Sequence, residues 1–293
     1  MLGVAPLSIA AATLAAVGER HWDPAWAAAD RAGVSLRRLD GLDDAEAVRS
    51  VITQVWGEQV LPRELIRAFQ HAGSVLYGAE AEGEMVGFVL GFAGLDGGLH
   101  VHSHMLAAVP GRQNHGVGYA LKLAQRAECL DLGIEEVRWT FDPLVARNAR
   151  FNLVKLGAEA FRFLPDFYGE MTDVLNRGDR SDRFEVRWRL RSVRVERALR
   201  GEAERPIARE AVLVAEGSDE APRPRQTGSP PEDGSTVAVP ADQHRVKTRD
   251  PALARDWRDA AGDAFRACFA RGLVATWYEP GVGYVFEETG AGR

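Results

Sequence analysis

Three histidines alternate with other side chains in a short stretch, Leu99 to Val109, that is expected to form a β-strand. Because successive side chains of a strand point to opposite faces, the three are predicted to share one face. These histidines are His100, His102 and His104, and the opposite face is expected to carry Val101, Ser103 and Met105. Imidazole exchanges protons near neutral pH, so this face can supply a general base or a proton relay. His104 is the first candidate for the base and His102 the second.

Two other interpretations of the histidines are a metal site and a purely structural role. Neighbouring side chains on one face of a strand lie about 7 Å apart, which places two of them poorly around one metal ion. We therefore predict no metal ligands here. A structural role, with each ring satisfied by hydrogen bonds, stays open beside proton transfer.

The strand is followed by a glycine-containing turn at the start of a helix. Gly116 and Gly118 leave main-chain N–H groups at the helix N-terminus without side chains that block approach, and such a terminus binds anionic groups. A tight turn that serves only close packing is the alternative. A dinucleotide-binding turn would need Gly-x-Gly-x-x-Gly, and Tyr119-Ala120-Leu121 after Gly118 does not supply it.

The wider spacing, Gln113-x-x-Gly116-x-Gly118 with Pro110 before it, resembles the acyl-CoA-binding signature of the GNAT superfamily of N-acetyltransferases. The resemblance extends over about Val34 to Leu190. It implies that acetyl-CoA is the cosubstrate and that an acceptor amine attacks its thioester directly. It also implies that the pyrophosphate of acetyl-CoA binds main-chain N–H groups of the turn and that the pantetheine lies along the end of the strand. The residues so implied are Ala107, Ala108, Val109, Gln113, Asn114, His115, Gly116, Val117, Gly118 and Tyr119.

A second region of resemblance is Asn148 to Ala158, where the family has a helix that ends in Lys-Leu-Gly. By this resemblance Asn148, and also Asn152, is expected to contact the cofactor, with helix capping by Asn148 as the alternative. The position at which the family often places a tyrosine acid is occupied by Leu153. Tyr168, in the loop before the last strand of the domain, is the predicted replacement.

The same loop carries acidic residues. Asp166 or Glu170 is expected to hold a cationic amine, unless the loop is simply solvated. The mixed charges that follow are predicted to form surface ion pairs rather than a phosphate site: Arg177, Asp179, Arg180, Asp182 and Arg183.

Hydrophobic periodicity predicts the elements that position these residues. Strands are expected at 34–40, 75–81, 85–92, 99–109, 137–141, 158–163 and 184–190, and helices near 43–57, 62–71, 117–132 and 146–156. The predicted fold class is α/β (α+β): a mixed, mostly antiparallel twisted sheet flanked by helices, similar to acyl-CoA N-acyltransferases, with a C-terminal helical extension. The acyltransferase domain is placed at residues 34–200.

The segments outside this domain are predicted to differ from it. Residues 1–33 are expected to be an N-terminal extension, and the absence of Lys and Arg from Met1 to Val4 disfavours an export signal. Residues 201–249 are predicted to be a flexible linker because 217–236 is rich in Gly, Pro and Ser and lacks aromatic side chains. Residues 250–293 are expected to form a helix and a strand that dock on the core or on a partner subunit, which allows a homodimer.

Composition limits the functional classes further. The chain of 293 residues has 36 Lys and Arg against 42 Asp and Glu, so its net charge of −6 disfavours a nucleic-acid partner. No segment is apolar enough to predict a membrane span, and only two cysteines are present, which favours a cytoplasmic protein. The predicted function is acetyl-CoA-dependent N-acetylation of an amine. The alternatives are a non-catalytic acyl-CoA-binding or regulatory module, and a purely structural or assembly role.

Overall fold

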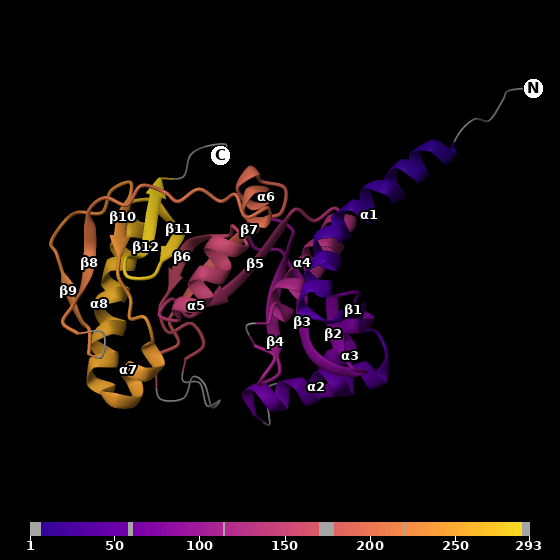
Figure 1. The fold of residues 1–293 in the computed structure, drawn as a ribbon, viewed down its shortest axis with the longest axis horizontal. Helices are drawn as coiled ribbons and strands as arrows, with labels where there is room; N and C mark the ends of the chain where they lie inside the picture. Colours follow the sequence, from indigo (N-terminus) through magenta and orange to yellow (C-terminus); the bar gives the residue numbers. More distant parts are fainter. Residues whose placement is uncertain (1–6, 58–60, 114, 170–178, 219–220, 289–293) are drawn as a thin grey trace, which may run out of the picture. The chain divides into compact units, whose positions relative to one another are not determined.

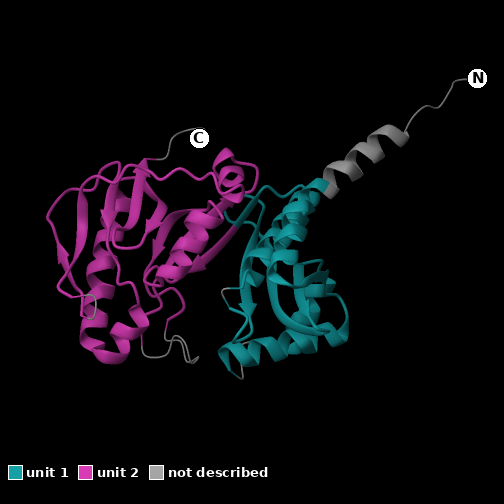
Figure 2. Cartoon of the chain, in the orientation of Figure 1, with its two compact units in different colours: residues 1–137 teal, residues 138–293 magenta. Residues whose placement is uncertain are grey.

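The computed structural model describes residues 7–57, 61–113, 115–169, 179–218 and 221–288. It divides into two compact units, residues 1–137 and 138–293 (Figure 2). Each unit contains strands and helices and is described by itself. Within the described residues, no helix combines the length and the apolar content that a bilayer crossing requires.

Unit 1 is a four-stranded antiparallel sheet, in the order β1-β2-β3-β4, with helices on both faces (Figure 1). Its elements are α1 (Leu7–Ala32), β1 (Ser35–Arg38), α2 (Leu42–Trp56), α3 (Arg63–His71), β2 (Val75–Ala81), β3 (Glu84–Gly94), β4 (His100–Ala108) and α4 (Val117–Asp131). The strands and helices that the sequence predicts here are all present, with ends that differ by one or a few residues.

The two faces of this sheet are packed by different helices. Phe88 and Leu90 of β3 and Met105 and Ala107 of β4 lie in one buried cluster with apolar side chains of α2 and α3. The opposite face packs against α4, where Gly87 is so close that a Cβ on it would lie 3.0 Å from Val117. Helix α1 covers the outer side of α4, and His21 and Trp22 both bond to Asp131 at its end, at 3.0 and 2.7 Å. The predicted N-terminal extension therefore packs on the acyltransferase elements from residue 20 onward.

Unit 2 contains the remaining strands, hydrogen bonded in the order β5-β7-β6-β11-β12-β10-β8-β9. Its elements are β5 (Glu136–Phe141), which begins at the unit boundary, α5 (Ala146–Ala149), the π-helix η1 (Arg150–Lys155), β6 (Glu159–Leu164), β7 (Arg183–Arg189), α6 (Val193–Leu199), β8 (Ala211–Glu216), β9 (Arg223–Gln226), β10 (Ser235–Val237), α7 (Gln243–Arg249), α8 (Pro251–Ala270), β11 (Leu273–Glu279) and β12 (Gly283–Glu288). The pair β8–β10 is parallel, and the other pairs whose register is defined are antiparallel. The predicted fold class, a mixed and mostly antiparallel sheet flanked by helices with a C-terminal helical extension, is confirmed.

The predicted flexible linker, 201–249, is wrong in its described part. Strand β10 pairs with β12 on one side and with β8 on the other, and Ser235 and Thr236 are buried. Trp257 of α8 donates a hydrogen bond to Pro222 O at 2.6 Å. Main-chain pairing with distant strands orders this segment, and Val212, Leu213 and Val237 are buried in it. The C-terminal helix α8 packs within the same unit, on β6, β9 and β11.

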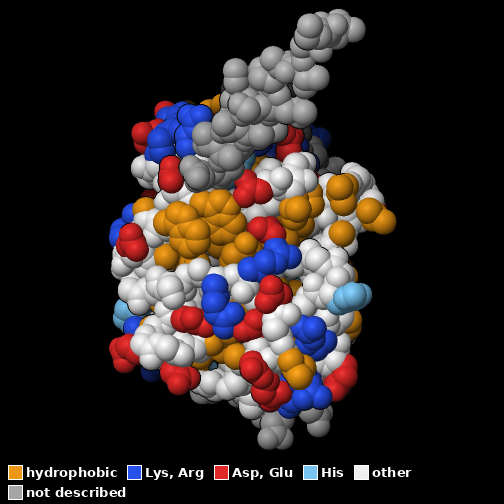
Figure 3. All heavy atoms as spheres, turned by 90° about the vertical axis from the view of Figure 1, so that its right-hand side faces the viewer, with side chains coloured by type: hydrophobic (Ala, Val, Ile, Leu, Met, Phe, Trp, Pro, Cys, Tyr) orange, Lys and Arg blue, Asp and Glu red, His pale blue; other side chains and the backbone are white. Residues whose placement is uncertain are grey.

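Charged and hydrophobic side chains mix on the surface, and one face shows a larger hydrophobic area (Figure 3). The large hydrophobic side chains of unit 1 that are exposed are Trp26, Leu42, Leu65, Leu95, Leu99 and Leu132. Trp26 stacks on Trp22, with ring centroids 5.2 Å apart. These rings extend the apolar side of α1 into solvent.

Candidate functional site

Strand β4 carries the predicted histidines and is interrupted by a bulge between two of them. In its pairing with β3, Met105 lies opposite Leu90 and Ser103 lies opposite the next residue, Gly91, so His104 is an extra residue. A bulge leaves one residue unpaired and shifts the facing of the side chains that follow. The prediction that Ser103 and Met105 share a face is therefore wrong: Ser103 bonds to α4, whereas Met105 packs in the cluster with α2 and α3.

The bulge nevertheless keeps His102 and His104 together. Their ring centroids lie 6.2 Å apart, and both rings lie beside Phe92, at 5.4 and 5.8 Å. His102 is half-buried and His104 is exposed. His100 is buried, and its Nδ1 lies 2.9 Å from Gly98 O, which is the structural role that the sequence left open.

Both paired imidazoles are held in the neutral form near neutral pH. Burial, with smaller contributions from His104, His100 and Lys122, lowers the pKa of His102 to about 4. Desolvation also lowers the pKa of His104 below its usual value. A neutral imidazole accepts a proton, so His104, the more exposed ring, can act as a base toward a molecule in solution. In the part of the chain that is described, no three His, Cys, Asp or Glu side chains form a group suited to a metal ion.

The glycine turn after β4 has the geometry of an anion-binding site. Gly116, with φ of 90°, is the N-cap of α4 and makes no side-chain cap bond. The first helical hydrogen bond runs from Ala120 N to Gly116 O at 3.0 Å, so the main-chain N–H groups of Val117, Gly118 and Tyr119 have no carbonyl partner within the helix. A Cβ on Gly118 would meet only Leu106, at 3.7 Å, which leaves open space in front of the first turn. This arrangement favours an oxyanion or phosphate group.

The other residues of the turn are accessible from solvent. Gln113, His115 and Gly116 are exposed, while Asn114 lies outside the described residues. Arg112 N donates to Val109 O at 3.0 Å, which closes the turn that leads from the strand to the helix.

The end of β4 offers main chain rather than side chains to a ligand. Ala107 is buried in the core cluster, and Ala108 and Val109 are half-buried. Val109 N donates to Val86 O at 2.9 Å, so this N–H is already used. Any pantetheine contact at Ala107 and Ala108 would therefore be made by peptide groups.

The remaining predicted site residues lie in unit 2. Asn148 lies inside α5, whose N-cap is Val145, so the capping alternative is wrong. Asn152 is buried and accepts a hydrogen bond from Trp139 Nε1 at 3.2 Å, which is a structural role. Leu153 is fully buried.

The loop that carries Tyr168 is tightly bonded. Tyr168 is exposed, its hydroxyl lies 3.2 Å from Thr140 Oγ1, and its main-chain N–H donates to Ser181 Oγ at 2.9 Å. Asp166, with φ of 46°, bonds through its carboxylate to Ser181 at 3.3 Å. Glu170 and Arg177 lie outside the described residues. The hydroxyl of Tyr168 thus shares a hydrogen bond with Thr140 on an exposed side chain, whereas the carboxylate of Asp166 serves the loop.

Several charged side chains are buried, among them Lys122 of α4 and Arg258 of α8, which were not predicted from the sequence to be buried. Arg258 binds Asp142 and Asp179. Asp182 and Arg183 are also buried, so the prediction of surface ion pairs is wrong for Asp179, Asp182 and Arg183. Lys122 stands between Leu121 and Leu123, whereas Arg258 is followed by Asp259, so only Lys122 has apolar neighbours on both sides in the sequence.

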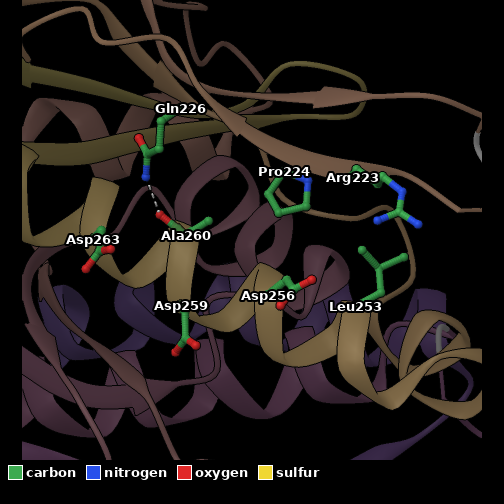
Figure 4. A pocket seen from close by; sticks show the side chains of 8 residues that line it. All are labelled: Arg223, Pro224, Gln226, Leu253, Asp256, Asp259, Ala260 and Asp263. Carbon is green, nitrogen blue, oxygen red and sulfur yellow. Dashed lines mark hydrogen bonds between the residues drawn. The ribbon is translucent and has the colours of Figure 1, made fainter.

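A separate pocket of about 420 Å³ lies between α8 and β9 (Figure 4). Asp256, Asp259 and Asp263 line it from α8, and Arg223 and Gln226 line it from β9. Asp259 accepts a bond from Arg180 at 2.9 Å, and Gln226 Nε2 donates to Ala260 O at 3.0 Å. Its acidic lining does not suit a pyrophosphate, so it is not a second cofactor site.

Comparisons with known proteins found several acetyltransferases of similar fold. Among solved structures, similar folds include the ribosomal-protein-S18-alanine N-acetyltransferase of Escherichia coli, at 16% identity and a TM-score of 0.45 over 54% of this chain and 94% of that one. They also include yncA of Salmonella typhimurium, solved with its cofactor acetyl-CoA, at 16% identity and a TM-score of 0.44 over 54% and 94%. An N-acetyltransferase of Staphylococcus aureus aligns at 11% identity and a TM-score of 0.45 over 54% and 99%. No curated protein matches the chain.

A family model matches part of the chain. Residues 45–157 match the family model of the acetyltransferase (GNAT) family. This range includes the histidine strand, its bulge, the glycine turn and α4. Residues 45–157 are therefore similar to acetyltransferases of the GNAT family.

Proposed function

We propose that this protein is an N-acetyltransferase that transfers the acetyl group of acetyl-CoA directly to an acceptor amine. The observation that carries the proposal is the exposed start of α4, where Val117, Gly118 and Tyr119 offer main-chain N–H groups directly after the bulged strand. Its position inside the segment that matches the GNAT family supports acetyl-CoA as the ligand.

In this proposal the N-terminus of α4 binds the pyrophosphate of acetyl-CoA. The pantetheine lies along the peptide groups of Ala107 and Ala108, as an added strand would. The amine nitrogen forms a bond to the thioester carbon, the carbonyl oxygen takes the negative charge, and the C–S bond then breaks. His104 accepts the proton that the amine loses.

The thiolate of CoA is the leaving group of the reaction. It takes up a proton, either from water or from Tyr168, whose hydroxyl is exposed. A thiolate of pKa near 8.5, like that of cysteine, is a tolerable leaving group, so the acid is not essential.

Asn148 is proposed to contact acetyl-CoA by resemblance alone. We also propose that the protein acts in the cytoplasm, in line with its unpaired thiols at Cys129 and Cys268.

The second candidate function is a non-catalytic acyl-CoA-binding or regulatory module. It is favoured by Leu153, an inert and fully buried side chain at the position where the family often has a tyrosine acid. A homodimer is not needed to complete either function, because the C-terminal segment finds its apolar partners within unit 2.

Calorimetric titration of acetyl-CoA into the full chain tests the proposal. The variant Gly118→Trp fills the space in front of the first turn of α4, whereas Leu132→Trp places the same side chain at the other end of this helix. We expect wild type and Leu132→Trp to bind and Gly118→Trp to lose binding. Equal heats from all three proteins reject the site. Binding without thiol release across a panel of amines favours the non-catalytic module.

A further inference from the structure

A lysine is buried between α4 and the bulged strand. Lys122 Nζ donates hydrogen bonds to Ser103 Oγ at 3.0 Å and to Gln125 Oε1 at 2.9 Å. Its residue is 2% exposed, and burial lowers the pKa of its amino group to about 7. A polar group at this depth is stabilised only when it is hydrogen bonded, so the bond to Ser103 is a strong local constraint.

The bond reaches the residue directly before the bulge. Ser103 lies opposite Gly91, and His104 is the inserted residue between Ser103 and Met105. Gly91 lets α4 approach closely here, since a Cβ on it would lie 2.7 Å from Gln125 Nε2. One side of the bulge is therefore tied to α4 through Ser103, and the other side is held in the core through Met105.

We infer that Lys122 is a positioning residue of the acetyl-transfer site: by holding Ser103, it keeps the bulge of β4 in the register that presents His104 to the acceptor amine. This inference rests on the function proposed above. Without the bond, Ser103 has no reason to face α4, and β4 can pair with β3 without the extra residue. His104 would then change its facing, because a shift of one residue turns each side chain to the other face.

Other charged and titratable groups lie on α4 and on the elements that pack against it. On its own helix are Cys129 and Arg126, and Glu128, which is bonded to Arg38 and to Tyr77 of β2. On β4, His102 is the group whose pKa Lys122 helps to lower, and α1 contributes His21, which is paired with Asp131. The link between Lys122 and His102 supplies a readout that does not depend on activity.

The experiment compares four full-length proteins: wild type, Lys122→Met, Ser103→Ala and, as a control, Lys155→Met, which alters an exposed lysine of η1. The imidazole titrations of His102 and His104 and the main-chain amide shifts of residues 102–105 are followed by NMR on isotope-labelled protein. CoA release from acetyl-CoA is measured with a panel of primary amines, and acetyl-CoA affinity by calorimetry.

We expect Lys122→Met and Ser103→Ala each to shift the amide signals of residues 102–105 and to lower kcat about ten- to a hundredfold, as a misplaced reacting group does. Acetyl-CoA affinity should stay within about twofold of wild type, because the N–H groups of α4 are unchanged. The pKa of His102 should rise in Lys122→Met, which loses the nearby charge, but not in Ser103→Ala, which keeps it. Lys155→Met should match wild type throughout.

Unchanged amide signals and unchanged kcat in both variants would overturn the inference. Lys122 would then only pack in the interior, without positioning His104. If Lys122→Met does not fold, Ser103→Ala decides alone, since it removes one hydroxyl and no charge. If wild type binds no acetyl-CoA, the proposed function fails, whereas the amide signals still show whether Lys122 holds the bulge.

Discussion

Arg258 of α8 donates two hydrogen bonds to the carboxylate of Asp142, which lies 116 residues earlier in the chain, at 2.7 and 3.0 Å. The same guanidinium binds Asp179 at 2.6 Å. Asp142 follows β5 directly and caps the next turn through Leu144 N. The C-terminal extension is thus bonded to a loop of the segment that matches the GNAT family, and Tyr284 adds a bond to Pro143 O at 2.7 Å.

Replacing Arg258 with Met should destabilise the protein strongly. The side chain of Arg258 is 4% exposed and those of Asp142 and Asp179 are 16% and 15% exposed, so the variant leaves two carboxylates close together without their cation. Loss of one partner from a buried ion pair costs about 3–5 kcal/mol. Urea unfolding measures the change. Arg266→Ala, which removes an exposed pair with Asp263, should cost at most about 1 kcal/mol, and similar losses in both variants would contradict the prediction.

Deleting residues 250–293 should prevent unit 2 from folding rather than release an independent domain. Phe184 of β7 is fully buried against the extension, with ring centroids 4.5 Å from Phe265 and 5.1 Å from Tyr284. The deletion exposes these apolar surfaces and an unpaired edge of β6. We expect aggregation in size-exclusion chromatography. A folded monomer from a dimeric parent would instead support an assembly role for the extension.

The glycine turn was predictable because its residue types are dictated by local backbone geometry. Gly116 adopts φ of 90°, which other residues rarely do, so its requirement is visible in the sequence itself. The strands β8, β9 and β10 were not predictable in this way. These strands are ordered by pairing with strands far away in the chain. Strand β10, for example, pairs with β12 near the C-terminal end of the extension.

Some features of strand β4 were predictable from the sequence and others were not. Alternation predicted that His102 and His104 share a face of the strand, and their ring centroids lie 6.2 Å apart. It did not predict the bulge, because the inserted residue becomes visible only when β4 is aligned with β3. For the same reason the burial of Lys122 was missed: α4 has α1 on one side and the sheet on the other, so most of its surface is inside.

His104→Gln should lower turnover and remove a step from its pH dependence. The pKa of His104 lies below its ordinary value near 6.5, so wild type loses its neutral base only as the pH falls below about 6.5. A general base contributes about a hundredfold to ten-thousandfold in rate. Ionisation of the amine affects both proteins equally, so the ratio of their kcat/KM values isolates the imidazole. The ratio should rise with pH up to about 6.5 and then level off.

His102→Gln serves as the comparison for His104→Gln. His102 is half-buried, so its loss should affect the position of the neighbouring ring more than the proton transfer itself. A ratio for His104→Gln that does not vary with pH would move the role of base to water or to Tyr168.

The buried amine of Lys122 should make folding stability increase with pH. Its pKa is about 7 in the folded protein, against about 10.4 in the unfolded chain. Between these values the unfolded chain binds a proton that the folded protein does not, so the free energy of unfolding rises by about 1.4 kcal/mol per pH unit.

Lys122→Met removes this contribution. Urea unfolding measures the free energy of unfolding of both proteins between about pH 7 and pH 9. We expect the value for wild type to increase with pH relative to the value for the variant. Burial raises the pKa of Cys129 to about 12, although the charge of Lys122 acts against this rise. Up to about pH 9 the folded thiol therefore stays protonated in both proteins, and its opposite effect on stability is common to them. Parallel pH dependences would mean that Lys122 keeps its charge in the folded state, and that its bond to Ser103 is made by an ammonium group at every pH of the experiment.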